Sequence, residues 1–152
     1  MTTFRNATKI PVPRFTAARQ RELRKRFSGV PFLNLLGMKV AKMSVGTVSL
    51  TMPVTKDIQQ YMGLVHGGAI STLADTAATF AALTALPDGT DVITIEFKLN
   101  FLEPIAKRGV AADAKLIRLG GRTAIAEATV REAGSGTPAA IGLFTMSVLR
   151  PK

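Results

Sequence analysis

Two kinds of hydrophobic pattern run along this chain of 152 residues and predict two kinds of secondary structure. Apolar and polar side chains alternate along residues 47–54, 93–101 and 122–132, and a period of two indicates strands with one buried face. Residues 110–119 and 139–149 complete a set of five predicted strands. The pair Gly120-Gly121, between two of these runs, indicates a hairpin.

A long buried helix is predicted over residues 66–85, because this alanine-rich segment is apolar on every side and long enough for five turns. A shorter helix is expected from residue 17 to about residue 27, with Thr16 as its N-cap. The order is short helix, strand, long helix and then four strands. It indicates an α+β fold in which a largely antiparallel sheet curls around the long helix.

The net charge of +10 is concentrated at the start of the chain. Residues 1–28 hold eight basic residues and one acidic residue, which gives this segment a net charge of +7. We therefore divide the chain into a basic N-terminal arm with a short helix, residues 1–28, and a folded domain, residues 29–152. The arm is interpreted as a solvated helix, with an anion-binding arm or an arginine-rich transit peptide as alternatives.

The absence of cysteine excludes a disulfide framework, a thiolate metal site and a cysteine nucleophile. A single histidine, His66, argues further against a metal site. No apolar run approaches the roughly 20 residues of a membrane helix, and the N-terminus lacks the apolar core of a signal peptide. We expect a cytoplasmic protein with no metal or other cofactor and no membrane partner.

Asp75 is anomalous, because it falls in the middle of the predicted buried helix among alanine, leucine and threonine. A buried carboxylate is costly unless it is hydrogen-bonded, paired or protonated, and burial raises its pKa. A raised pKa suits a general base. The alternative is a structural carboxylate that is satisfied by Thr72, Thr76 or Thr79.

His66-Gly67-Gly68 falls at the start of the same helix, where backbone N–H groups lack partners and the helix dipole is positive. Glycines allow a ligand to approach that backbone closely, so the segment is a candidate oxyanion hole for a thioester carbonyl. The alternative is a loop that needs glycine only for its turn. A Ser-His-Asp triad lacks support, because no GxSxG-like segment is present.

The spacing between these two features adds information. Gly67 and Asp75 are eight residues apart, which corresponds to about 12 Å along one helix. A carbonyl bound at Gly67 is therefore out of reach of water held at Asp75 of the same helix. A site at a two-fold interface would solve this, since each subunit would supply what the other lacks.

The segment GLVHGGAISTLAD, residues 63–75, together with PFLNLLGMKV and TIEFKLNFLEP, resembles the PaaI-like branch of the hotdog-fold thioesterases. The resemblance covers residues 32–150. It implies the hotdog fold, a curved antiparallel sheet wrapped around one long helix, assembled as homodimers and often as dimers of dimers. The specific element is His-Gly-Gly with an aspartate nine positions after the histidine.

The resemblance also implies roles for individual residues. Asp75 matches the acid that acts as general base or nucleophile, and Gly67 matches the glycine whose N–H binds the thioester carbonyl from the other subunit. His66 matches a histidine that shapes the site, and Thr94 falls where Ser or Thr often positions the water. Gln60 departs from the family, which usually has asparagine there, and its extra methylene moves the amide.

The activity implied is hydrolysis of an acyl-CoA to a carboxylic acid and free CoA. Gly68 is a candidate substrate-binding residue. The cations Lys107, Arg108, Arg118 and Arg122 are further candidates, because cations can bind the phosphates of CoA. For each cation, solvated surface charge is the alternative.

The fold implied by the resemblance also hosts two other functions. A dehydratase relies on a histidine in a different surrounding pattern, which is absent here. A non-catalytic acyl-CoA sensor with a DNA-binding domain is the main alternative, but one short basic helix is fewer than a helix-turn-helix needs. Asp75 also favours catalysis, so no nucleic-acid partner is expected.

Overall fold

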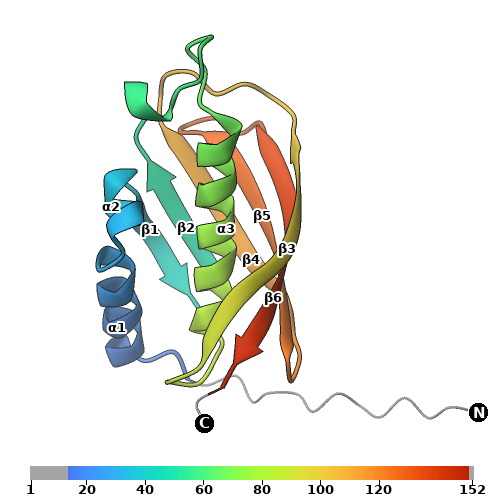
Figure 1. Cartoon of the computed structure of the whole chain (residues 1–152). Coiled ribbons are helices and arrows are strands. Elements are labelled where there is room, and N and C mark those ends of the chain that lie inside the picture. The colour runs from blue at the N-terminus through green and yellow to red at the C-terminus, as the bar shows by residue number, and fades with distance from the viewer. Residues whose placement is uncertain (1–13, 151–152) are drawn as a thin grey trace, which may run out of the picture.

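The computed structural model describes residues 14–150, and this part of the chain folds into a six-stranded antiparallel sheet packed against one long helix (Figure 1). The strands are β1 (Lys39–Ser44), β2 (Thr47–Met52), β3 (Asp91–Phe101), β4 (Val110–Leu119), β5 (Thr123–Glu132) and β6 (Ala140–Leu149). Their order across the sheet is β1-β2-β4-β5-β6-β3, so β1 and β3 form its two edges. The predicted α+β class and hotdog architecture are confirmed.

The long helix α3 (Gly67–Thr84) lies across the concave face of the sheet (Figure 1). Alternate residues of each strand point toward it, as on β5, where the buried positions are Ala124, Ala126, Ala128 and Val130. Small side chains at these positions let the helix approach the sheet closely, while Leu73, Phe144 and Met146 fill the space that remains. The helix occupies nearly all of the predicted range 66–85.

Strand β1 is absent from the sequence-based prediction, which had five strands instead of six. Lys39 and Lys42 interrupt its apolar pattern, and a register shift between Val40 and Lys42 breaks the period of two. An edge strand tolerates both features, because one of its sides meets solvent. Two short helices, α2 (Pro31–Leu35) and the 3-10 turn η1 (Lys56–Ile58), were also not predicted.

Helix α1 (Ala17–Ser28) begins at the predicted cap, where the Thr16 side chain accepts from the Arg19 N–H at 3.1 Å. Its Leu23 and Phe27 belong to the same buried cluster as the sheet, and the Phe27 ring meets the Phe80 ring of α3 edge-on at 5.2 Å. The interpretation of α1 as a solvated helix is therefore wrong for the face that carries Leu23 and Phe27, because an apolar stripe needs a partner.

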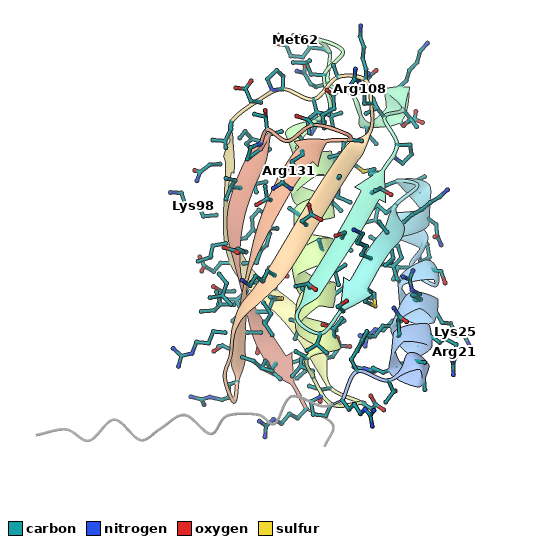
Figure 2. The ribbon with its side chains drawn as sticks, turned by 180° about the vertical axis from the view of Figure 1, so that it is seen from behind. Arg21, Lys25, Met62, Lys98, Arg108 and Arg131 are labelled. Carbon is teal, nitrogen blue, oxygen red and sulfur yellow. The ribbon has the colours of Figure 1, made fainter. Side chains whose placement is uncertain are left out.

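Arg19 adds a polar contact between α1 and the end of α3. Its guanidinium is buried, donates to the Leu83 carbonyl oxygen at 3.3 Å and lies 3.3 Å from an Asp88 carboxylate oxygen. On the opposite side of α1, Arg21 and Lys25 extend away from the sheet (Figure 2). The remaining part of the predicted arm, residues 1–13, lies outside the described residues.

Replacing Leu23 with alanine should lower the free energy of unfolding by about 2–5 kcal/mol, because it removes a fully buried side chain and leaves a cavity. The exposed Arg21→Ala variant should change it by less than about 0.5 kcal/mol. Denaturant unfolding at fixed protein concentration measures both. Equal, small effects would show that α1 is an independent arm.

Candidate active site

The N-terminal end of α3 presents one backbone donor without a partner. His66 is the N-cap of the helix, and its Nδ1 accepts from the Gly68 N–H at 2.9 Å. A neutral His66 therefore carries its proton on Nε2. Within residues 14–150 the Gly67 N–H has no hydrogen-bond acceptor. Gly67 is thus the donor left to bind an incoming ligand, while the Gly68 N–H is occupied.

The backbone that leads into α3 is fixed by hydrogen bonds to neighbouring segments. The His66 N–H donates to the Ile58 carbonyl at 2.8 Å, and the Val65 N–H donates to the Ile105 carbonyl at 2.8 Å. These contacts set the direction of the free Gly67 N–H before any ligand arrives. Such preorganisation is what makes an oxyanion hole effective.

A cavity of about 320 Å³ opens at this donor. Gly67, Gln60 and Phe101 are among its lining residues. A Cβ atom at position 67 would lie 3.2 Å from the Phe101 ring, so glycine leaves the N–H accessible where a side chain would crowd it. Phe101 was not predicted as a site residue, because strand β3 lies far from the histidine-glycine segment in the sequence.

Gln60, the residue that replaces the usual asparagine, lies in the loop before α3. Its Oε1 accepts from the Met62 N–H at 2.8 Å, which turns the amide oxygen back into its own loop. The amide nitrogen has no acceptor among residues 14–150 and is free to donate. Gln60 lines the Gly67 cavity, and its amide nitrogen is a donor without an acceptor in the described part of the chain.

Asp75 lies half-buried near the middle of α3, where its Oδ1 accepts from the Thr94 Oγ1 of β3 at 2.7 Å. Burial raises the pKa of the Asp75 carboxyl above its ordinary value of 3.8, and the hydrogen bond from Thr94 offsets part of this increase. A half-exposed carboxylate with a raised pKa can accept a proton from water.

The structural alternative for Asp75 does not hold for two of its three proposed partners. Thr76 Oγ1 donates to the Thr72 carbonyl at 2.7 Å, and Thr72 Oγ1 donates to the Gly68 carbonyl at 2.8 Å. Threonines commonly bond to the preceding helical turn in this way. The hydroxyl that reaches Asp75 instead comes from a different element of the fold, the edge strand β3.

A β-bulge in β3 is what aims Thr94 at the helix. The register of β3 against β6 shifts between Thr94 and Glu96, so that Thr94 faces Met146 and Phe97 faces Phe144. Both β6 residues are buried against α3, and directly paired residues share a face of the sheet. Strict alternation would have placed Thr94 and Phe97 on opposite faces, and the extra residue Ile95 brings them to the same one.

Replacing Thr94 with valine should move the acid limb of the pH–rate profile to higher pH. The Thr94 hydrogen bond lowers the pKa of Asp75, so its loss leaves burial to raise that pKa further, and a base must be ionised to act. Rates of thioester hydrolysis between pH 4 and 9 measure the shift. Thr94→Ser keeps the hydroxyl and should retain the wild-type limb; a shift of equal size in both variants would contradict the assignment.

The four candidate cations fall into two groups. Lys107 and Arg108 lie in the loop before β4, and Arg108 is at the same end of the molecule as Met62, in the loop before α3 (Figure 2). Arg118 and Arg122 lie at the other end of β4, which as a ten-residue strand is about 30 Å long. Within one chain, only the first pair is near the Gly67 cavity.

The free Gly67 N–H and the Asp75–Thr94 pair are thus two separate candidate half-sites along one helix. Gly67 and Asp75 both belong to α3, with about 12 Å between them along its axis, and Asp75 does not line the Gly67 cavity. One half offers a hydrogen-bond donor for an oxyanion, and the other offers a carboxylate with a hydroxyl partner. The combination suits an addition of water to a carbonyl carbon.

Comparison with known proteins assigns this chain to a family. The family model of the thioesterase superfamily matches residues 62–139, about half of the chain. A thioesterase family protein from Silicibacter pomeroyi is 30% identical, with 86% of this chain and 96% of that chain covered and a TM-score of 0.77.

Two further solved structures share the fold. A thioesterase from Haemophilus influenzae has a TM-score of 0.79 and 25% identity over 93% of this chain and 96% of its own. The PaaI protein from the phenylacetic acid degradation operon of E. coli has a TM-score of 0.75 and 22% identity, over 88% of this chain and 93% of its own.

The chain belongs to the thioesterase superfamily and has its hotdog fold. It is therefore a hydrolase of the thioesterase class, as the segment from Gly63 to Asp75 predicted. No helix within residues 14–150 combines the length and apolar character needed to cross a membrane.

Proposed function

We propose that this protein hydrolyses acyl-CoA thioesters to a carboxylic acid and free CoA, in an active site that two subunits share. The thioester carbonyl oxygen would accept from the Gly67 N–H of one subunit. Asp75 of the partner subunit would remove a proton from the attacking water, or attack the carbonyl carbon directly, and Thr94 would hold the carboxylate in place. Collapse of the tetrahedral species then breaks the carbon–sulfur bond, and the thiolate leaves as CoA after it takes up a proton, which on the water route is the one that Asp75 removed. After direct attack, water would hydrolyse the anhydride between the acyl group and Asp75, which releases the carboxylic acid and restores the carboxylate.

The observation that carries this proposal is the separation of the two half-sites on α3. Each half is chemically suited to a thioester, and neither suffices alone. A two-fold arrangement of helices would place Gly67 of one chain beside Asp75 of the other, because an isologous interface matches residue i with residue j in both directions.

The edge strand β3 supplies a surface for this pairing. Phe97 and Phe101 lie on the helix side of β3, and the β6 residues paired with them are buried. Even so, Phe97 is 44% exposed and Phe101 is 54% exposed. In residues 14–150 no strand pairs with the outer edge of β3. An exposed apolar edge of this kind is a liability in a monomer and is expected to be covered.

A second interface, which would make a dimer of dimers, fits the outer face of the sheet. Ile141 and Leu143 of β6 are exposed there, on the side of the sheet away from α3. Light scattering combined with size-exclusion chromatography distinguishes a dimer from a tetramer. Truncation of both side chains to serine should convert a tetramer into an active dimer.

Free CoA release from a panel of aryl-, short-chain and medium-chain acyl-CoAs tests the proposed activity. Release above the background rate with at least one substrate supports it, and the preferred member of the panel identifies the acyl group. An absence of release from every member would overturn the assignment to acyl-CoA substrates.

A further inference from the structure

The loop between β3 and β4 borders three cavities, one of which, of about 340 Å³, is lined by Glu132 as well. Its first part, from Leu102 to Ile105, lines the cavity of about 320 Å³ that contains the Gly67 donor. Its last part, Arg108 and Gly109, lines a second cavity of about 270 Å³, together with Lys39 of β1. One short loop thus connects the place of the thioester with a cavity that two cations border.

Glu132, at the end of β5, holds the middle of this loop. Its Oε1 accepts from three consecutive backbone N–H groups, those of Lys107 at 2.9 Å, Arg108 at 3.2 Å and Ala106 at 3.4 Å. The N–H donors of Lys107 and then Arg108 lower the pKa of the Glu132 carboxyl from its ordinary value, so the group is ionised at neutral pH. A carboxylate is the strongest acceptor a side chain can offer to such donors.

Both ends of the loop are fixed as well. The Ile105 carbonyl accepts from the Val65 N–H at 2.8 Å, two residues before Gly67. The Gly109 carbonyl accepts from the Ala133 N–H at 2.9 Å, next to Glu132. Glu132 therefore holds the middle of the loop, residues 106–108, between these two hydrogen-bonded ends.

Glu132 forms no ion pair with the neighbouring cations, although the charge of Arg108 also contributes to its lowered pKa. Backbone N–H groups, rather than the side chains of Lys107 and Arg108, make its hydrogen bonds. Among residues 14–150, neither Lys107 nor Arg108 has a carboxylate oxygen within ion-pair distance. Two unpaired cations at a fixed place can bind a phosphate group without first breaking an internal ion pair.

We propose that Glu132 is a positioning residue for the phosphate-bearing end of the substrate, and that it acts by holding the backbone of residues 106–108. The inference rests on the proposed acyl-CoA activity and deepens it, because it assigns substrate affinity to a residue that touches no substrate. Glu132 lies far from the motif in the sequence, and its role depends on a contact between a strand end and a loop.

A comparison of two thioesters tests this role. The preferred acyl-CoA carries phosphates, whereas the matching S-acylpantetheine has the same acyl group and thioester without them. Glu132→Ala should raise KM for the acyl-CoA by about tenfold, as expected for loss of one charge-assisted interaction, and leave both kinetic constants for the S-acylpantetheine unchanged. Glu132→Gln, which keeps an acceptor oxygen, should show a smaller rise. Glu127→Ala, on the exposed side of the same strand, is the control.

A double-mutant cycle separates positioning from general stability. In a Lys107→Ala/Arg108→Ala background, Glu132→Ala should have no further effect on KM for the acyl-CoA, because the groups through which it acts are gone. Equal losses with both thioesters, or an undiminished effect in that background, would show a structural role and overturn the proposal. If the alanine variant does not fold, Glu132→Gln undergoes the same two comparisons.

Failure of this inference is distinguishable from failure of the proposed function. A wild-type protein that cleaves S-acylpantetheine but no acyl-CoA would remove acyl-CoA as the substrate class. A wild-type protein that cleaves acyl-CoA, with Glu132→Ala equal to it on both thioesters, would remove only the role of Glu132.

Discussion

Asp75→Asn should lower kcat for thioester hydrolysis by about 10²–10⁴-fold while the fold is retained, because the amide can neither accept the proton nor attack the carbonyl. The substitution preserves the shape of the side chain and its contact with the Thr94 hydroxyl. Free CoA release under saturating substrate measures kcat, and circular dichroism checks the fold. Glu127→Gln, an exposed change of the same kind on β5, should retain full activity.

The same variant has a predictable effect on stability. Burial raises the pKa of Asp75 in the folded state, so its protonated form is favoured there. The contribution of protonated Asp75 to the free energy of unfolding is fully present below the unfolded-state pKa, near 3.8. It is lost as pH rises through the folded-state pKa. Relative to Asp75→Asn, the wild type should therefore lose stability as pH rises through that interval. Melting temperatures measured from pH 3 to pH 8 follow the difference; a wild type that gained stability relative to the variant would contradict it.

Gly67→Pro should lower kcat by about 10²–10³-fold, the usual effect of losing one oxyanion donor. Proline removes the free N–H and is otherwise tolerated at the first position of a helix. His66 already has the extended backbone, ψ 136°, that a residue before proline prefers. Gly67→Ala is the matched control, since it adds the same Cβ beside the Phe101 ring but keeps the N–H. If both variants lost the same amount, crowding rather than the missing donor would be responsible.

Mixed subunits give the second part of this test. Asp75→Asn chains retain Gly67, and Gly67→Pro chains retain Asp75, so each hybrid dimer would contain one complete site and one doubly defective site. After full subunit exchange, half of the dimers are hybrids, and about one quarter of wild-type activity should return. Differently tagged chains verify the exchange. Continued inactivity in verified hybrids would mean that both half-sites serve the same chain.

Elements with a strong local period could be predicted from the sequence, and those that depend on tertiary contacts could not. The alanine-rich helix and the five predicted strands follow from side-chain spacing alone. Strand β1 could not be predicted, because two lysines hide its period and its formation depends on pairing with β2. The burial of Leu23 and Phe27 was missed for a similar reason: basic residues surround a narrow apolar stripe on α1.

The same distinction, between local sequence patterns and tertiary contacts, applies to the residues of the candidate site. His66, Gly67 and Asp75 could be identified because they lie close together in the sequence and on one helix. Phe101 and Glu132 could not, since the fold brings them to the Gly67 end from strands that are distant along the chain. Thr94 was expected through family resemblance only. Its contact with Asp75 depends on a register shift that no period of two contains.

The bulge at Ile95 separates β3 into two segments with different tasks. Residues on its N-terminal side set the position of the hydroxyl at Asp75, and residues on its C-terminal side form the apolar edge and the wall of the Gly67 cavity. In relatives of this enzyme, an insertion or deletion between positions 94 and 97 would therefore not be a neutral change in strand length. It would rotate one segment relative to the other, and the chain could keep its fold and its oligomer while losing alignment between the acid and its hydroxyl partner.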